Sequence, residues 1–300
     1  MIEAKDFKVD LGNDINELKK DVIASFKSDP EMYAFIHENL KLTTKEVNAN
    51  LASLVSYKED KDYCKNCPGL ANCAKAYPRY NLILRRDFNN IVCEYTMCPF
   101  ALAEQEKRSR YIIRDFPKEW LDIEMENIDL NSASRKRLLK EFLTSVKTRN
   151  NKWFFIKGNH GCGKSLLAAA YSNYYLKKVG KGGVYTNLTK LIGNLSSLFI
   201  ENKPEFNKRF DAISNSPLVV IDDFGNEFPT DFSFSNIIFP LIHYRATKNL
   251  PTCFVSEFGI DEIKEVYSKI NRIRVNQLTN IIKEHIGDEF DVSGVSYHSK

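Results

Sequence analysis

The sequence predicts an α/β fold in the second half of the chain, with helices on both faces of a parallel sheet, and a small α+β domain ahead of it. From Trp153 onward, short apolar runs alternate with longer segments of helical composition, which is the order expected of a parallel sheet. Before that point, helical periodicity gives way to two strand-like runs and to five of the chain's seven cysteines. A chain of 300 residues is long enough for two such domains.

The composition is that of an ordinary globular protein, with 43% hydrophobic and 27% charged residues. A net charge of +4 is too small to indicate nucleic-acid binding by itself. No apolar run approaches the length of a membrane span, and the first residues do not resemble a signal peptide. We therefore expect a cytoplasmic protein whose cysteines are thiols or metal ligands rather than disulfides.

We expect the first domain to span residues 1–103 and the second residues 121–300, with a linker at 104–120. The linker region is charged, lacks a clear apolar period and contains Lys107-Arg108-Ser109-Arg110. A solvated linker or loosely held arm is the favoured interpretation. A basic arm that touches a nucleic-acid backbone is the alternative.

The first domain opens with helical signals. Residues 13–27 carry apolar side chains at the spacing of one helix face. Asp29-Pro30 is a helix start signal, and Thr43-x-x-Glu46 has the form of a capping box. A small helical bundle and a helical surface for a partner protein are equally compatible with this pattern. Two strands are then expected at residues 81–86 and 91–95.

The cysteines of this domain have the spacing of a structural zinc site. Cys64 and Cys67 form a C-x-x-C pair, and Cys73, Cys93 and Cys98 follow. Five thiols compete for the four places of a tetrahedron. We choose Cys64, Cys67 and Cys98 first, and Cys73 ahead of Cys93 for the fourth. A redox dithiol is the rival interpretation of C-x-x-C.

The second domain contains a phosphate-binding loop. Residues 158–165, GNHGCGKS, fit G-x-x-x-x-G-K-S between a predicted strand at 153–156 and a predicted helix at 166–178. Backbone N–H groups of such a loop cradle phosphates, the lysine reaches the terminal phosphates and the serine hydroxyl suits Mg²⁺. The residues expected to hold the nucleotide are Gly158, Asn159, His160, Gly161, Cys162, Gly163, Lys164, Ser165 and Leu166.

A second motif completes the predicted nucleotide site. Residues 218–221 are an apolar strand that ends in Asp222 and Asp223. Ligands of open parallel sheets bind at the carboxyl ends of the strands. Asp222 would hold Mg²⁺ with Ser165, and Asp223 would orient or deprotonate the attacking water. The two motifs together predict ATP or GTP hydrolysis.

Further strands and helices are expected after the phosphate loop. The predicted strands lie at residues 183–187 and 252–256, and the predicted helices at 189–201, 204–214, 232–248 and 260–267.

At this point the sequence resembles a known family. DDFGNE at 222–227 and LIHYRATKNLPTCFVSEF at 241–258 are similar to the AAA+ ATPases that load bacterial replicative helicases, the DnaC and DnaI proteins. C-x-x-C, Cys73 and Cys98-Pro99 resemble the zinc-bearing front domain of the DnaI type, which DnaC lacks. The resemblance implies an AAA+ P-loop NTPase domain preceded by a small zinc-binding domain.

The same resemblance implies cofactors and partners. They are ATP, Mg²⁺ and Zn²⁺, a hexameric replicative helicase, single-stranded DNA and neighbouring copies of the chain. Adjacent AAA+ subunits donate an arginine to each other's nucleotide, and here Arg272 and Arg274 are both candidates.

The chain also departs from the family pattern. Glu257 stands where the family has a sensor asparagine, and it can accept a hydrogen bond from the attacking water but, unless protonated, cannot donate one to phosphate. Slow or altered hydrolysis is therefore expected, and Glu257 joins Asp223, Arg272 and Arg274 as a candidate catalytic residue. Asn81 replaces a histidine of the zinc module, and the end of the chain at 294–298 has His298 in place of an arginine.

Two other functions compete with a helicase loader. One is a transposition helper ATPase similar to IstB, which shares the DD-x-G-x-E stretch but not the zinc-bearing front end. The other is a zinc-stabilised adaptor that binds ATP as a switch without useful turnover, an idea to which Glu257 gives weight.

Overall fold

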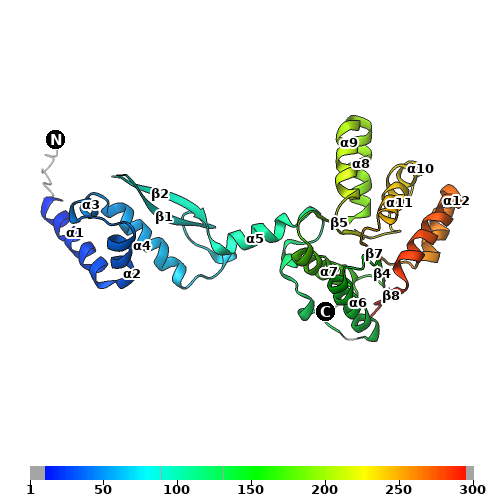
Figure 1. The fold of residues 1–300 in the computed structure, drawn as a ribbon, viewed down its shortest axis with the longest axis horizontal. Helices are drawn as coiled ribbons and strands as arrows, with labels where there is room; N and C mark the ends of the chain where they lie inside the picture. The colour runs from blue at the N-terminus through cyan, green and yellow to red at the C-terminus, as the bar shows by residue number, and fades with distance from the viewer. Residues whose placement is uncertain (1–10, 89, 131, 295–300) are drawn as a thin grey trace, which may run out of the picture. The chain divides into compact units, whose positions relative to one another are not determined.

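The computed structural model describes residues 11–88, 90–130 and 132–294. The chain divides into two compact units, Met1–Gln105 and Glu106–Lys300. Figure 1 traces the helices and strands of each unit.

The first unit is helical at its start and ends in a β-hairpin. Its helical segments are α1 (Leu11–Ser28), α2 (Pro30–Ala34), η1 (Phe35–Asn39), α3 (Thr44–Ala49), α4 (Leu51–Lys65) and η2 (Leu70–Asn72), and α5 (Pro99–Ser109) begins within it. The predicted start signals are confirmed: Asp29 caps α2 by accepting from the Met32 N–H at 3.1 Å, and Thr43 and Glu46 form the capping box of α3.

The hairpin consists of β1 (Tyr80–Asp87) and β2 (Asn90–Met97), which pair antiparallel from Tyr80↔Met97 to Asp87↔Asn90. The two predicted strands are therefore confirmed. Leu82 and Leu84 of β1 are buried against the helices, because alternate residues of a strand point to one face. The core that they complete includes Phe26, Met32, Ile36, Val47 and Leu54.

The second unit is built on a six-stranded sheet whose order is β3-β5-β6-β7-β4-β8, with every neighbouring pair parallel. The strands are β3 (Tyr111–Arg114), β4 (Phe154–Lys157), β5 (Gly183–Asn187), β6 (Val219–Asp222), β7 (Thr252–Ser256) and β8 (Glu289–Asp291). Strand β7 lies between β4 and β6, so the carboxyl ends of these three strands are neighbours.

Helices cover both faces of this sheet, as predicted. They are α6 (Ala133–Thr148), α7 (Lys164–Val179), α8 (Leu188–Glu201), α9 (Lys203–Ser214), α10 (Asp231–Ser233), η5 (Phe234–Ile238), α11 (Phe239–Thr247) and α12 (Ile260–Ile286), with the short η3 (Lys118–Asp122) and η4 (Met125–Asn127). Phe154 and Ile156 face the core under α6 and α7, whereas Phe155 faces the core under α8, α11 and α12. This alternation explains why β4 is apolar throughout.

Residues 104–120 differ from the linker that the sequence predicts. Tyr111–Arg114 is the edge strand β3, which pairs with β5, and Phe116 is buried beside it. The expectation of a loosely held arm is therefore wrong for residues 111–114. The sequence does not reveal this strand, because four residues among charged neighbours leave no visible apolar period.

In the part of the chain that the structure describes, every helix is too short or too polar to cross a bilayer.

Candidate nucleotide-binding site

The phosphate loop runs from the end of β4 to the start of α7, the context that the sequence predicts. Gly161 and Gly163 have φ of +74° and +86°, a region that residues with a Cβ rarely occupy. A Cβ on Gly158 would lie 2.7 Å from the Cys162 Sγ, so the loop also needs glycine there for close approach. The backbone N–H groups at the start of α7 are left without intrahelical partners, as an anion site requires.

Ser165 and Asp222 are brought together at the base of this loop. The Ser165 Oγ donates to Asp222 Oδ1 at 3.1 Å, and the Tyr185 hydroxyl lies 2.8 Å from Asp222 Oδ2. Burial raises the pKa of the Asp222 carboxyl above its ordinary value, and the neighbouring Asp223 adds to this, while the Tyr185 hydrogen bond opposes it. A divalent cation bound here would offset the negative charge of the buried Asp222 carboxylate and of Asp223 beside it.

Asp223 is held by a residue that the sequence analysis does not single out. Asn187 at the end of β5 donates through Nδ2 to Asp223 Oδ2 at 2.6 Å, and its Oδ1 accepts from the Lys190 N–H at the start of α8. Asp223 itself has φ of +58°, a strained backbone conformation for a residue with a side chain. The signal for Asn187 in the sequence is its place at the carboxyl end of a predicted strand.

Lys164 points to the residue after β7. Its Nζ lies 3.3 Å from Glu257 Oε1, and the His160 Nδ1 lies 3.2 Å from the same oxygen. The sheet order explains the meeting, because β7 is the immediate neighbour of β4. The structure thus places Glu257 against the phosphate loop.

The remaining loop residues contact other parts of the unit. The Asn159 side chain forms reciprocal hydrogen bonds with the backbone of Gly294, at 3.0 and 2.9 Å. Arg135 of α6, which is buried, donates to the Cys162 carbonyl. These contacts join the loop to the end of β8 and to α6, and neither is visible in the sequence. Tyr297 and His298 of the predicted tail motif lie outside the described residues.

The arginine candidates lie on α12. The helix is interrupted at Asn271, which has φ −151° and ψ 91°, and whose Oδ1 accepts from the Arg274 N–H as a new helix start would. Arg272 and Arg274 follow this break and are exposed. Both side chains are accessible to another molecule.

Glu227, the last acid of DDFGNE, is buried and braces the turn after β6. Its Oε2 accepts from the Gly225 N–H at 2.9 Å, and its Oε1 accepts from the Tyr267 hydroxyl of α12. Burial raises its pKa to about 7, with Asp223 contributing, although backbone hydrogen bonds oppose the shift. Gly225 has φ of +93°, so the turn needs glycine as well.

In the first unit, four of the predicted zinc ligands line one cavity of about 180 Å³: Cys64, Cys67, Cys73 and Cys98. The Cys98 Sγ accepts from the Ala101 N–H at 3.4 Å, and the Lys75 Nζ lies 3.4 Å from the Cys64 Sγ. Cys93 is exposed on β2 opposite Leu84. No group of three or more His, Cys, Asp or Glu side chains that could hold a metal ion occurs within residues 11–88, 90–130 and 132–294.

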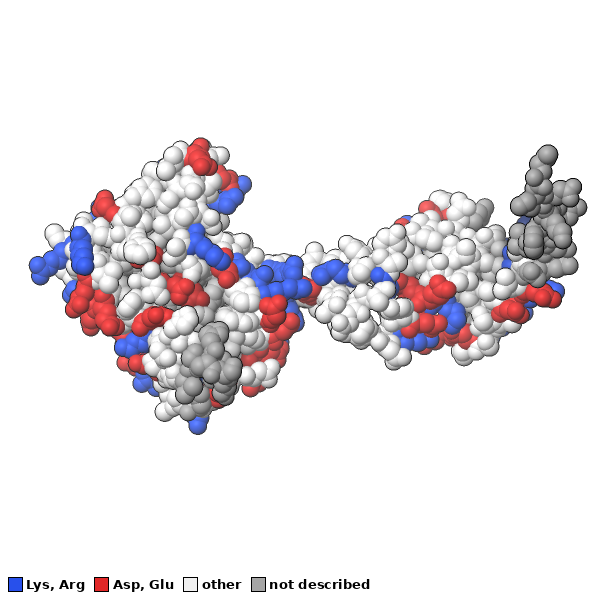
Figure 2. Space-filling model, turned by 180° about the vertical axis from the view of Figure 1, so that it is seen from behind, with Lys and Arg blue, Asp and Glu red and all other residues white. Residues whose placement is uncertain are grey.

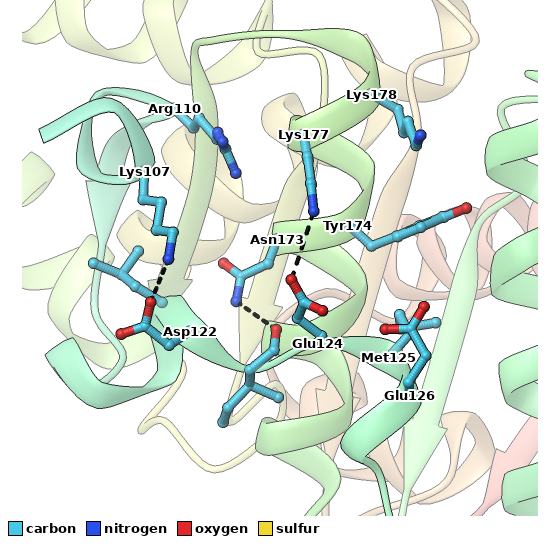
Figure 3. A pocket seen from close by; sticks show the side chains of 12 residues that line it. Lys107, Arg110, Asp122, Glu124, Met125, Glu126, Asn173, Tyr174, Lys177 and Lys178 are labelled. Carbon is cyan, nitrogen blue, oxygen red and sulfur yellow. Dashed lines mark hydrogen bonds and ion pairs between the residues drawn. The ribbon is translucent and has the colours of Figure 1, made fainter. Parts of the chain in front are cut away.

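Lys107 and Arg110 of the basic segment line a separate cavity of about 330 Å³ in the second unit, shown in Figure 3. Lys107 pairs with Asp122 there, and Arg110 pairs with Glu106 at 3.1 Å. Lys177 at the far end of α7 lies 3.5 Å from Glu124. Since carboxylates of the same unit neutralise these cations, the alternative of a nucleic-acid-binding arm gains no support here.

A parallel sheet, a glycine-rich loop between β4 and α7, and acids at the end of β6 are together the features of the P-loop class of α/β proteins. Comparison with known proteins adds a family that part of the chain matches. Residues 4–95 match the family model described as the N-terminus of the primosomal protein DnaI.

The chain is also similar to known helicase loaders. It is 23% identical over 271 residues to the replicative helicase loader DnaI of Bacillus subtilis strain 168, covering 88% of this chain and 85% of that protein. It is 24% identical over 181 residues to the replicative helicase loader DnaC of Buchnera aphidicola, covering 58% of this chain and 71% of that protein. The predicted resemblance to the DnaI and DnaC loaders is therefore confirmed.

Solved structures share the fold. A crystal structure of DnaI superposes with a TM-score of 0.54 at 22% identity, covering 61% of this chain and 97% of that one. A crystal structure of the DnaC helicase loader gives a TM-score of 0.51 at 22% identity, covering 58% and 99%. The α/β fold with a helix-covered parallel sheet is confirmed by these likenesses.

Proposed function

We propose that this protein is an ATP-dependent loader of the replicative DNA helicase onto single-stranded DNA. One observation carries the proposal: a chain whose residues 4–95 match the DnaI N-terminal family also joins Ser165 to Asp222 under a phosphate loop. The first unit would bind the helicase, and nucleotide turnover in the second unit would release it. A protein with this task would work in the cytoplasm, where the chromosome lies.

The residues of the second unit fit a magnesium nucleotide. The Ser165 hydroxyl and the Asp222 carboxylate are oxygen ligands of the kind that Mg²⁺ prefers. Bound Mg²⁺ would neutralise charge on the phosphates. Asp223 would then accept a proton from, or orient, the attacking water, and Asn187 would hold its carboxylate in place.

We also propose that the first unit binds a structural zinc ion through Cys64, Cys67, Cys73 and Cys98. The support is that these four thiols line one cavity, whereas Cys93 is exposed elsewhere on the hairpin. The Ala101 N–H at the Cys98 sulfur and the Lys75 ammonium near the Cys64 sulfur would both stabilise thiolates. The thiols would need to draw together from their described positions to reach zinc–sulfur bonding distance.

Three further elements of the proposal follow from the resemblance. Neighbouring copies would associate through their AAA+ units, with Arg272 or Arg274 reaching the next nucleotide. Single-stranded DNA would be contacted by the second unit. Figure 2 shows acidic and basic side chains interspersed among the described residues of each unit in that view, so those residues form no broad basic surface there that would mark the DNA path.

A binding and turnover experiment tests the proposal. The full chain is mixed with the hexameric replicative helicase of its host, and the two should elute together in gel filtration with ATP. Phosphate release by the chain alone, lost in Asp223→Asn, would exclude the adaptor that does not turn over ATP. No complex with the helicase would overturn the loader proposal, and remodelling of target DNA without helicase binding would favour the IstB-like alternative.

A further inference from the structure

The phosphate-loop lysine already has an anionic partner in the protein itself. Glu257 Oε1 lies 3.3 Å from the Lys164 Nζ and 3.2 Å from the His160 Nδ1. The Lys164 side chain is only 6% exposed and that of Glu257 is 30% exposed, so solvent screens this pair less than it screens a surface ion pair. A single carboxylate oxygen thus contacts both Lys164 and His160 of the phosphate loop.

The fold fixes the position of Glu257. Strand β7 lies between β4 and β6, and Glu257 is the first residue after it. The preceding Ser256 is fully buried, donates through Oγ to the Phe224 carbonyl at 2.6 Å and accepts from the Phe258 N–H at 2.9 Å. Because both sides of the turn are tied down, the Glu257 carboxylate is presented to the loop by rigid backbone.

We propose that Glu257 is an internal anion that occupies the terminal-phosphate position of the loop and makes the site discriminate against a third phosphate. The inference rests on the proposed ATP site and deepens it. Its role lies in binding: a nucleoside triphosphate must separate the Glu257 carboxylate from Lys164 before Lys164 can hold the terminal phosphates.

The physical reason is competition and repulsion. A diphosphate brings fewer negative charges toward Lys164 and leaves more of the Glu257–Lys164 contact intact. A triphosphate places its terminal phosphate against the carboxylate. Its binding is therefore weakened both by the loss of the Glu257–Lys164 ion pair and by the repulsion between like charges. Removal of the Glu257 charge should therefore tighten binding of the triphosphate more than that of the diphosphate.

The test compares two nucleotides across matched variants. Dissociation constants for ADP and for a slowly hydrolysed ATP analogue, both with Mg²⁺, are measured by calorimetry on the full chain. Glu257→Gln keeps the shape and removes the charge, and Glu257→Asn is a second, shorter variant. Asp261→Asn is the control, because Asp261 is a nearby exposed acid that pairs with Lys283 instead. Lys164→Ala tests the site itself.

We expect Glu257→Gln and Glu257→Asn to tighten the ATP analogue about tenfold, as one partly screened charge contact allows, and ADP by about threefold or less. Asp261→Asn should leave both constants unchanged. This inference alone would be overturned by one combination of results. The wild type binds nucleotide and Lys164→Ala abolishes that binding, but the ratio of the two dissociation constants is unchanged in both Glu257 variants. If the wild type binds neither nucleotide, the proposed function falls with it.

Discussion

The hydroxyl of Ser165 lies 3.1 Å from the carboxylate of Asp222, although the two residues are 57 positions apart in the chain. The parallel sheet produces this meeting, because β4 and β6 end at the same edge with only β7 between them. The strand order of the sheet thus brings the two halves of the candidate site together. Asp223, one residue on, is turned away from regular strand geometry and held by Asn187.

Replacement of Asp222 should impair nucleotide binding, whereas replacement of Asp223 should impair turnover. Asp222→Asn removes the negative charge of the proposed Mg²⁺ ligand, and we expect it to weaken Mg²⁺-dependent nucleotide binding about tenfold or more. Asp223→Asn should leave binding within about twofold and lower the turnover rate by about 10²–10⁴-fold, the range for loss of a general base. Calorimetry and phosphate release distinguish the two effects. Asp211→Asn is the control, because Asp211 is an exposed residue of α9. Identical defects in the Asp222 and Asp223 variants would contradict the assignment of separate roles.

Arg245 should be required for stability rather than for chemistry. It is fully buried and donates to the Thr252 hydroxyl and to the carbonyls of Ser214, Ser216 and Pro251. Burial lowers its pKa to about 9, so the side chain remains charged at neutral pH.

Arg245→Met leaves several buried acceptors without a donor, and we expect the free energy of unfolding to fall by about 3–5 kcal/mol. Urea unfolding measures this. Arg209→Met on α9, whose side chain is 59% exposed, is the control and should change stability by less than about 0.5 kcal/mol. If Arg245→Met also changes the free energy of unfolding by less than about 0.5 kcal/mol, the buried arginine is dispensable for stability.

Glu227 should make stability depend on pH. Burial raises its pKa from an ordinary 4.5 to about 7, so between these values the folded protein holds a proton that the unfolded chain has released. Its contribution to the free energy of unfolding is therefore full below about pH 4.5, declines as the pH rises from there through about 7 and is lost above that.

Glu227→Gln should flatten this part of the stability curve. Relative to the wild type, the variant should gain about 1–3 kcal/mol between pH 5 and pH 8. Tyr267→Phe, which removes the hydroxyl that donates to Glu227, keeps the carboxyl and should keep the slope. Curves for wild type and Glu227→Gln that run parallel over this range would refute the assignment.

The fourth zinc ligand can be decided between Cys73 and Cys93. Cys73 lines the cavity with Cys64, Cys67 and Cys98, whereas Cys93 is exposed on β2. Cys73→Ser should lower the zinc content of the purified chain and the melting temperature of the first unit, and Cys93→Ser should change neither. Metal analysis and thermal unfolding give both readouts. Zinc loss in Cys93→Ser alone would reverse the choice, and a wild-type chain without zinc would end the zinc proposal.

The local parts of this molecule follow from the sequence. The phosphate loop, the capping box at Thr43 and the strands around Asp222 depend on short patterns whose physical causes lie within a few residues. The order of β4, β5, β6, β7 and the helices between them was therefore predictable. The helix predicted at 260–267 is the exception in extent, because α12 continues to Ile286.

The long-range parts do not follow from the sequence. Strand β3 is four residues long at a sheet edge, and β8 has three residues, so neither leaves a clear periodic pattern. The partners of Arg245, Glu227 and Asn187 come from segments far along the chain, and only the fold brings them together. Glu257 departs visibly from the family pattern in the sequence, but its contact with Lys164 depends on the order of strands in the sheet.

The most direct test of the account is a loading assay on closed circular single-stranded DNA, which has no end for a helicase ring to thread. Helicase retained on the circle is measured with ATP and wild-type protein, with Asp223→Asn and with Lys164→Ala. We predict that the wild type raises the retained helicase severalfold and that both variants fail to do so. Retention that is independent of this protein, or equal for the wild type and both variants, would contradict the claim that its nucleotide cycle delivers the helicase.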